Sequence, residues 1–134
     1  MLRSDLQKLA MARGADARAL FAAGRYDAAY YLAGLAVECA LKARIARDVR
    51  RFTFPDRRLA ERAFTHDLKK LLDSAGLKSD LENAPDVIQI RWDLVFNWSV
   101  DVRYKSGLSA DDCSRYLRAI FGPGGILPWL KQRW

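Results

Sequence analysis

The 134-residue sequence has little of what most catalytic and metal-binding sites are built from. Two cysteines and one histidine provide neither a paired-cysteine zinc motif nor a histidine cluster, and we expect no metal ion and no cofactor. No glycine-rich phosphate loop follows a strand-like segment, and the Glu-x-x-His pairs of helical di-metal proteins are absent. The sequence therefore excludes most of the familiar catalytic classes.

Long apolar runs are also missing. No uncharged run approaches the roughly 20 residues that a membrane-spanning helix needs, so we expect no membrane association. Arg3, Asp5 and Lys8 interrupt the first ten residues, which rules out the apolar core of a signal peptide. Cys39 and Cys113 lie far apart in apolar helical patterns, as small buried hydrophobic residues in a reducing compartment would. We expect a soluble, cytoplasmic protein.

Positive charge is abundant, with a formal net charge of +7, and it is concentrated in one segment between residues 44 and 62. The arginines of this segment are Arg44, Arg47, Arg50, Arg51, Arg57, Arg58 and Arg62. Because Phe52 and Phe54 lie among them, the segment suits phosphate pairing and base stacking, which makes it a candidate RNA contact. Solvated or oligomer-facing surface is the alternative, since cations are also favoured near a helix C-terminus.

Hydrophobic periodicity predicts an all-α protein, an up-and-down bundle of four to five helices in one domain over residues 1–134. Helices are expected over residues 3–23, from Asp27 to about 48, over 65–76 with Thr65 as N-cap, over 86–104, and after the N-cap Ser109 to Phe121. The spacing S-x-x-E at residues 79–82 predicts a capping box. An arginine-rich loop with a turn at 57–63 and an apolar tail over 122–134 complete the chain.

The central element of this bundle is the helix that begins at Asp27. Between residues 28 and 43 only Glu38 and Lys42 are charged, so the helix is apolar nearly all round and must have several neighbours. The two charges are four residues apart and are expected to pair across one turn. One seam of the core is expected to consist of Tyr30, Ala33, Val37 and Leu41.

The single histidine, His66, is the candidate for acid–base chemistry near neutral pH. It follows Arg62 by four positions, and a cation beside an imidazole could activate a ribose 2′-hydroxyl and stabilise the phosphate, as in metal-independent ribonucleases. The alternative is that His66 helps to cap the helix and packs its ring against a neighbour. Arg62 and His66 are therefore the catalytic candidates, if the protein is an enzyme.

Three segments together resemble the HEPN family of small all-α domains (higher eukaryote and prokaryote nucleotide-binding). They are YDAAYYLAGLAVECALKA, THDLKKLL and WDLVFNWSVDVRY, and the similarity extends from about Arg18 to Phe121. The resemblance implies an up-and-down helical bundle that is usually dimeric. It also implies a partner, because such domains are often encoded beside a minimal nucleotidyltransferase as a toxin–antitoxin pair.

The RNase members of that family carry an arginine, four to six residues and then a histidine. This chain departs from the pattern, because three residues separate Arg62 from His66 and the later helices contain no histidine. By resemblance it is similar to the branch that binds nucleotides or partner proteins without cleaving RNA. The ligand-binding candidates are Arg47, Arg50, Arg51, Arg103, Tyr104 and Lys105.

The expected function is thus a non-catalytic, HEPN-like nucleotide- or partner-binding module. Two alternatives remain open: a toxin-type ribonuclease that uses Arg62 and His66, and an RNA-binding protein that uses the 44–62 segment. A homodimer is expected as well, because four tryptophans and the ILPWL tail exceed what a bundle of this size is expected to bury.

Overall fold

The computed structural model describes residues 2–51, 61, 63–98 and 107–134. These residues form an all-α bundle and contain no strand, which confirms the predicted fold class. The helices are α1 (Arg3–Ala22), α2 (Tyr26–Arg51), α4 (Leu68–Ser74), α5 (Lys78–Glu82), α6 (Asp86–Val95), α7 (Ala110–Phe121) and α8 (Ile126–Lys131). There are more helices than the predicted four to five, because the 79–82 segment and the tail each form a short one. None of the helices described is long and apolar enough to cross a membrane.

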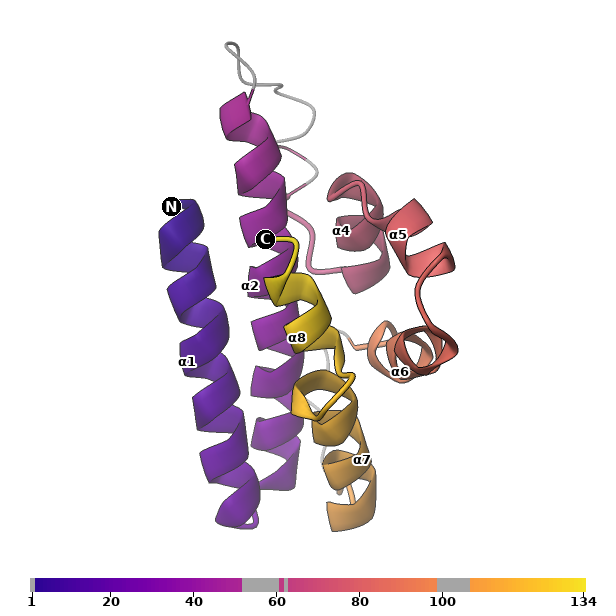
Figure 1. The fold of residues 1–134 in the computed structure, drawn as a ribbon. Helices are drawn as coiled ribbons and strands as arrows, with labels where there is room; N and C mark the ends of the chain where they lie inside the picture. Colours follow the sequence, from indigo (N-terminus) through magenta and orange to yellow (C-terminus); the bar gives the residue numbers. More distant parts are fainter. Residues whose placement is uncertain (1, 52–60, 62, 99–106) are drawn as a thin grey trace.

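The first two helices form an antiparallel hairpin (Figure 1). Gly24 lies in the connection with φ +76, and its neighbour Arg25 donates its backbone N–H to Leu20 O at 2.8 Å. Glycine adopts this left-handed conformation without a Cβ clash, so the reversal needs only the short link between α1 and α2. The predicted hairpin is confirmed.

The second helix, α2, is the centre of the bundle and contacts α1, α4, α7 and α8. Its side chains Ala33, Val37 and Leu41 are fully buried, while Tyr30 is partly buried with its ring 4.2 Å from that of Tyr116. The predicted seam is therefore part of the core. Small residues on α2 let its neighbours approach closely on more than one side.

Two predicted helix starts are wrong. Asp67, not Thr65, caps α4: its carboxylate accepts the backbone N–H groups of Lys69 and Lys70, whereas the Thr65 hydroxyl accepts the N–H of Asp67 one step earlier. Both residue types cap well, and the one adjacent to Leu68 takes the position. The capping box expected at Ser79 does not form, because α5 begins at Lys78 with Leu77 as an N-cap that makes no side-chain hydrogen bond.

The helix predicted over 86–104 is shorter in the structure. It ends at Val95, and Phe96 and Asn97 turn the chain so that Trp98 packs against α2. Burial of this large ring outweighs the few hydrogen bonds that a longer helix would add. Residues 99–104 of the prediction lie outside the described part, as does most of the turn expected at 57–63.

The tail after α7 forms α8 and docks on the bundle. Its side chains Ile126, Leu127, Trp129 and Leu130 are buried in the common core. Two arginines of α2 fasten it, because Arg44 and Arg47 donate to the backbone oxygen of Arg133 at 2.8 and 3.1 Å.

Large rings fit inside this small bundle more readily than we expected. Trp92, Trp98 and Trp129 are all buried, each with less than a tenth of its surface exposed. The premise that such rings must cover an interface is therefore wrong for these three residues. The homodimer itself stays a prediction.

Both cysteines are free and buried, as predicted. Burial, and then the charge of Glu38, raise the pKa of the Cys39 thiol to about 11. Burial, and then the charge of Asp27, raise the pKa of the Cys113 thiol to about 11. Both groups are therefore neutral thiols near neutral pH and contribute to packing as small apolar groups.

Candidate functional site

Glu38 is the only buried charged residue in the described part of the chain, with 2% of its surface exposed. It lies midway along α2, where its neighbours Val37 and Cys39 are core residues. A buried carboxylate destabilises the fold strongly unless charged or hydrogen-bonding groups compensate it. The residues that contact the Glu38 carboxylate are therefore candidates for a functional site.

Two residues compensate this carboxylate, and both meet the same oxygen. Lys42 Nζ lies 3.6 Å from Glu38 Oε1, which confirms the predicted pair across one turn of α2. His66 reaches Oε1 from the loop before α4 and makes its contact through Nδ1. A carboxylate oxygen accepts hydrogen bonds, so Nδ1 is the donor and Nε2 is the nitrogen left to meet a ligand.

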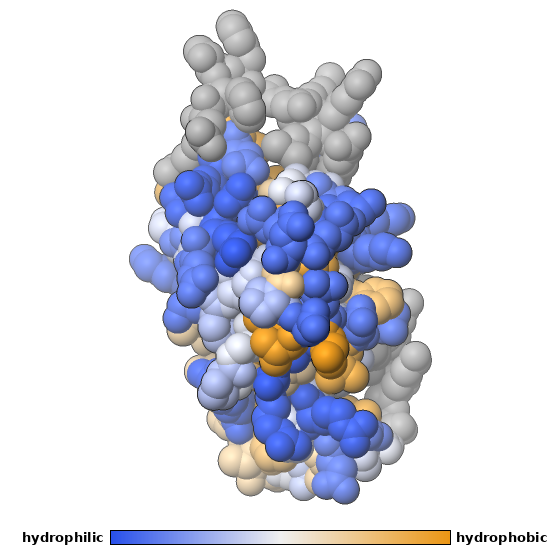
Figure 2. Space-filling view, turned by 45° about the vertical axis from the view of Figure 1, so that its right-hand side comes forward, coloured by the Kyte–Doolittle hydropathy of each residue, from blue (hydrophilic) through white to orange (hydrophobic). Residues whose placement is uncertain are grey.

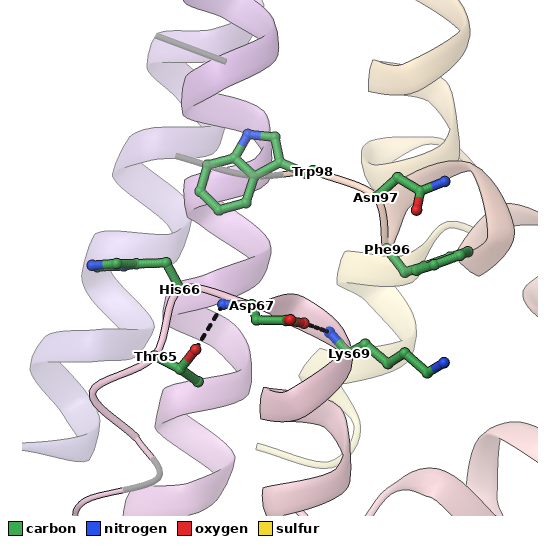
Figure 3. Close-up of a pocket in the computed structure, with 7 residues that line it drawn as sticks. All are labelled: Thr65, His66, Asp67, Lys69, Phe96, Asn97 and Trp98. Atoms are coloured by element: carbon green, nitrogen blue, oxygen red, sulfur yellow. Dashed lines mark hydrogen bonds between the residues drawn. The ribbon is translucent and has the colours of Figure 1, made fainter. Parts of the chain in front are cut away.

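His66 is otherwise open to solvent, with 55% of its side chain exposed. Asp67 caps α4, so the prediction that His66 helps to cap this helix is wrong. The contact with Glu38 fixes the direction of the ring. Figure 3 shows the ring below the indole of Trp98 and directed away from Lys69, and the contact with Glu38 places it against α2.

A cavity of about 420 Å³ adjoins the imidazole. It is bounded by the turn before α4 and by the segment after α6, and its lining residues are Thr65, His66, Asp67, Lys69, Phe96, Asn97 and Trp98. This volume falls within the range of small-molecule sites, roughly 300 to 1,000 Å³. The lining combines an imidazole, an ammonium group, a carboxylate, a hydroxyl, an amide and two aromatic rings.

Trp98 forms one side of this cavity and packs closely against α2. Gly34 leaves room for the indole: a Cβ added there would lie 2.1 Å from Trp98 Nε1. Tyr31, on the same helix, stacks on Trp98 with ring centroids 5.9 Å apart. The glycine in the apolar run of α2 therefore positions the segment that carries Phe96 and Asn97.

The other predicted site residues are not gathered at this cavity in the described part. Arg47 is engaged with the backbone oxygen of Arg133 near α8. Arg50 and Arg51 end α2, but their side chains fall outside the description, and so do Arg62, Arg103, Tyr104 and Lys105 entirely. The proposed pair of Arg62 and His66 is thus untested, whereas Glu38 is a partner of His66 that the sequence did not reveal.

One feature of the sequence could have indicated the contact between Glu38 and His66. A carboxylate in a helix that is apolar all round needs compensation, and Lys42 alone is a single partner at 3.6 Å. His66 was the one imidazole available. Its 28-residue separation from Glu38 is bridged only by tertiary packing, so no local pattern encodes it.

The described residues contain no group of three or more His, Cys, Asp or Glu side chains placed to hold a metal ion. The chemistry that these residues offer is therefore that of an oriented imidazole beside a cavity with cationic and aromatic sides. Searches against protein-family models, curated proteins and solved structures found no match to this chain.

Proposed function

We propose that this protein is a HEPN-like module that binds a nucleotide in the cavity beside His66 and does not cleave it. The observation that supports this proposal is the exposed imidazole, held by the buried Glu38 carboxylate at the edge of a 420 Å³ cavity. A fixed ring loses little conformational entropy when a ligand binds, which favours affinity. The resemblance of the sequence to HEPN domains supports the same class of ligand.

The lining residues supply the separate contacts that a nucleotide requires. Lys69 provides an ammonium group for a phosphate, and Phe96 provides an aromatic ring on which a base can stack. Asn97 adds an amide with both donors and an acceptor. Asp67 also borders the cavity, but one of its carboxylate oxygens already accepts two backbone N–H groups of α4, which reduces its repulsion of an anion.

Lys69→Ala is expected to weaken nucleotide binding by at least about tenfold, because it removes a charge-assisted contact worth roughly 1.5 to 3 kcal/mol. Titration calorimetry with ATP, GTP and their nucleosides measures this change. Lys70→Ala is the matched control, since Lys70 follows directly in α4 but borders a different cavity. Its affinity should stay within about twofold of the unmodified protein.

Two results would contradict nucleotide binding at this cavity. One is the absence of heat or competition with any nucleotide at millimolar concentration. The other is an equal loss of affinity in the Lys69 and Lys70 variants, which would indicate nonspecific attraction to a basic protein. Nucleosides that bind as well as nucleotides would remove the role given to the phosphate.

A metal-independent ribonuclease is the second candidate, and the Glu38–His66 contact is the observation in its favour. An imidazole oriented by a carboxylate can remove the proton of a ribose 2′-hydroxyl, whose oxygen then attacks the adjacent phosphorus. The departing 5′-oxygen must be protonated in turn. The chain has one histidine, so a second acid would have to come from another residue or another subunit.

We expect the purified protein to cleave no RNA beyond background, and His66→Ala to lower only the free energy of unfolding, by about 1 to 3 kcal/mol, because the buried Glu38 carboxylate loses one of its two partners. Gel analysis of a labelled RNA in the presence of a chelator, together with urea denaturation, tests both parts. Glu38→Gln is the companion variant, because it retains an acceptor oxygen for Nδ1. Chelator-resistant cleavage that disappears in His66→Ala would establish the ribonuclease instead.

The proposed module acts with other proteins. A nucleotidyltransferase-like partner follows from the family resemblance, and a homodimer remains part of the proposal. RNA contact through the 44–62 segment is compatible with the same fold, because its first arginines lie along the C-terminal half of α2. Co-purification followed by mass spectrometry would identify partners and bound nucleotides together.

A further inference from the structure

Helix α6 is apolar on two faces. Its inner face packs Ile88, Trp92 and Val95 into the core. Its outer face carries Val87, Ile90 and Leu94, which are 46%, 62% and 44% exposed. The spacing of these three residues places them in one stripe along the helix, and a helix that is apolar on both sides is normally covered on both.

This outer stripe is the densest exposed apolar group in the described part of the chain. Of the other large exposed hydrophobic residues, Leu2 is the N-cap of α1, Met11 is on α1, and Phe64 is in the loop before α4. Figure 2 shows an orange patch in the middle of the face to which α6 belongs, surrounded by hydrophilic surface. Contiguous apolar groups with a polar rim are characteristic of protein interaction sites.

The charge along one edge of the stripe is negative, although the protein as a whole carries +7. Asp86 and Asp93 are seven residues apart on α6, on the same side of the stripe, and both are exposed. On the opposite edge, Arg91 donates its guanidinium to the backbone oxygen of Arg118, so this cation is already engaged. The unbalanced charge beside the stripe is thus acidic.

A groove continues from the stripe toward α8. Its volume is about 610 Å³, and Val87 belongs to both the groove and the stripe. Pro128 and Trp129 of α8 form the apolar part of its far side, and Asn83 adds a polar group at the end of α5. A rod that lies along α6 would therefore have an apolar floor, a recess on one side and carboxylates on the other.

We propose that the outer face of α6 binds an amphipathic helix of a partner protein whose apolar side is flanked by lysine or arginine. The apolar side covers Val87, Ile90 and Leu94, and the cations meet Asp86 and Asp93. A second copy of this chain is the poorer occupant. Three half-exposed side chains provide far less area than the roughly 800 Å² per partner of a stable dimer.

The test uses a fluorescein-labelled peptide of leucine and lysine that forms an amphipathic helix, with fluorescence anisotropy as the readout. Saturable binding is expected, and Ile90→Ser should weaken it about tenfold because the most exposed apolar contact is lost. Met11→Ser, at an exposed position on α1, is the matched control and should bind as the unmodified protein does. A protein with both Asp86→Lys and Asp93→Lys should bind this peptide more weakly, and it should bind a peptide of leucine and glutamate more tightly than the unmodified protein does.

Three outcomes would overturn this assignment. The first is equal binding of a peptide that has the same composition in scrambled order, and the second is an Ile90→Ser protein that binds as Met11→Ser does; either result removes the stripe as the docking site. The third is a dimer, detected by light scattering, that dissociates in Ile90→Ser alone, which would make a second copy the occupant. None of these readouts depends on nucleotide binding, and a homodimer through another face is compatible with the proposal.

Discussion

Leu41→Asp is expected to leave the protein unfolded at 25 °C. Leu41 is fully buried on α2, at the centre of the bundle, where α2 contacts α1, α4, α7 and α8. An unpaired carboxylate in such a place costs several kcal/mol, in addition to the lost apolar burial, against a total stability of about 5 to 15 kcal/mol. Circular dichroism should show loss of most helical signal and no cooperative thermal transition.

Met11→Asp is the control for this experiment, because it introduces the same charge into a helix at an exposed position. Its free energy of unfolding should change by no more than about 1 kcal/mol. A Leu41→Asp protein with unchanged helicity and melting temperature would show that α2 is not the centre of the core.

Gly34→Ala is expected to destabilise the protein by about 1 to 3 kcal/mol, although alanine is the better helix former by about 1 kcal/mol. The added methyl group would lie 2.1 Å from Trp98 Nε1, well inside van der Waals contact. The indole is buried and stacked on Tyr31, so a shift away from α2 would break that packing. Urea denaturation followed by circular dichroism measures the change.

Gly14→Ala provides the comparison, because this glycine is also within a helix but meets a softer neighbour. Its new Cβ would lie 2.9 Å from the edge of the Phe121 ring, which is only partly buried and can shift. We expect it to cost less than Gly34→Ala by at least about 1 kcal/mol. Equal effects at the two glycines would indicate that Trp98 does not pack on α2 as described.

Since Trp98 borders the cavity, Gly34→Ala should also weaken nucleotide binding.

Much of the fold could be predicted from the sequence because its signals are local. Ser109 caps α7 by accepting the backbone N–H of Asp112, as its spacing from the following apolar residues indicated. Gly76, with φ +71, ends the α4 region, and the N–H of Leu77 reaches back to Leu72 O. Such caps depend on residues within one turn of each other, so the chain order alone contains them.

The boundaries that failed are decided by contacts between distant segments. The end of α6 depends on Trp98 meeting Gly34, 64 positions earlier in the numbering, and no periodicity near residue 95 anticipates it. The prediction of the candidate site was incomplete for the same reason. His66 was identified as a candidate from its chemistry, but its partner Glu38 lies 28 residues earlier, on α2, and was expected to pair only with Lys42.

The docking of α8 has a consequence for how the protein is made. A chain leaves the ribosome from its N-terminal end, at about 5 to 20 residues per second, so the α1/α2 hairpin emerges well before residues 126–134. Until those residues arrive, Leu130 and Trp129 cannot cover their share of α2 and the neighbouring helices. During translation, the nascent hairpin therefore exposes the apolar surface of α2 that α8 later covers. Arg44 and Arg47 complete the closure only when the backbone oxygen of Arg133 reaches them.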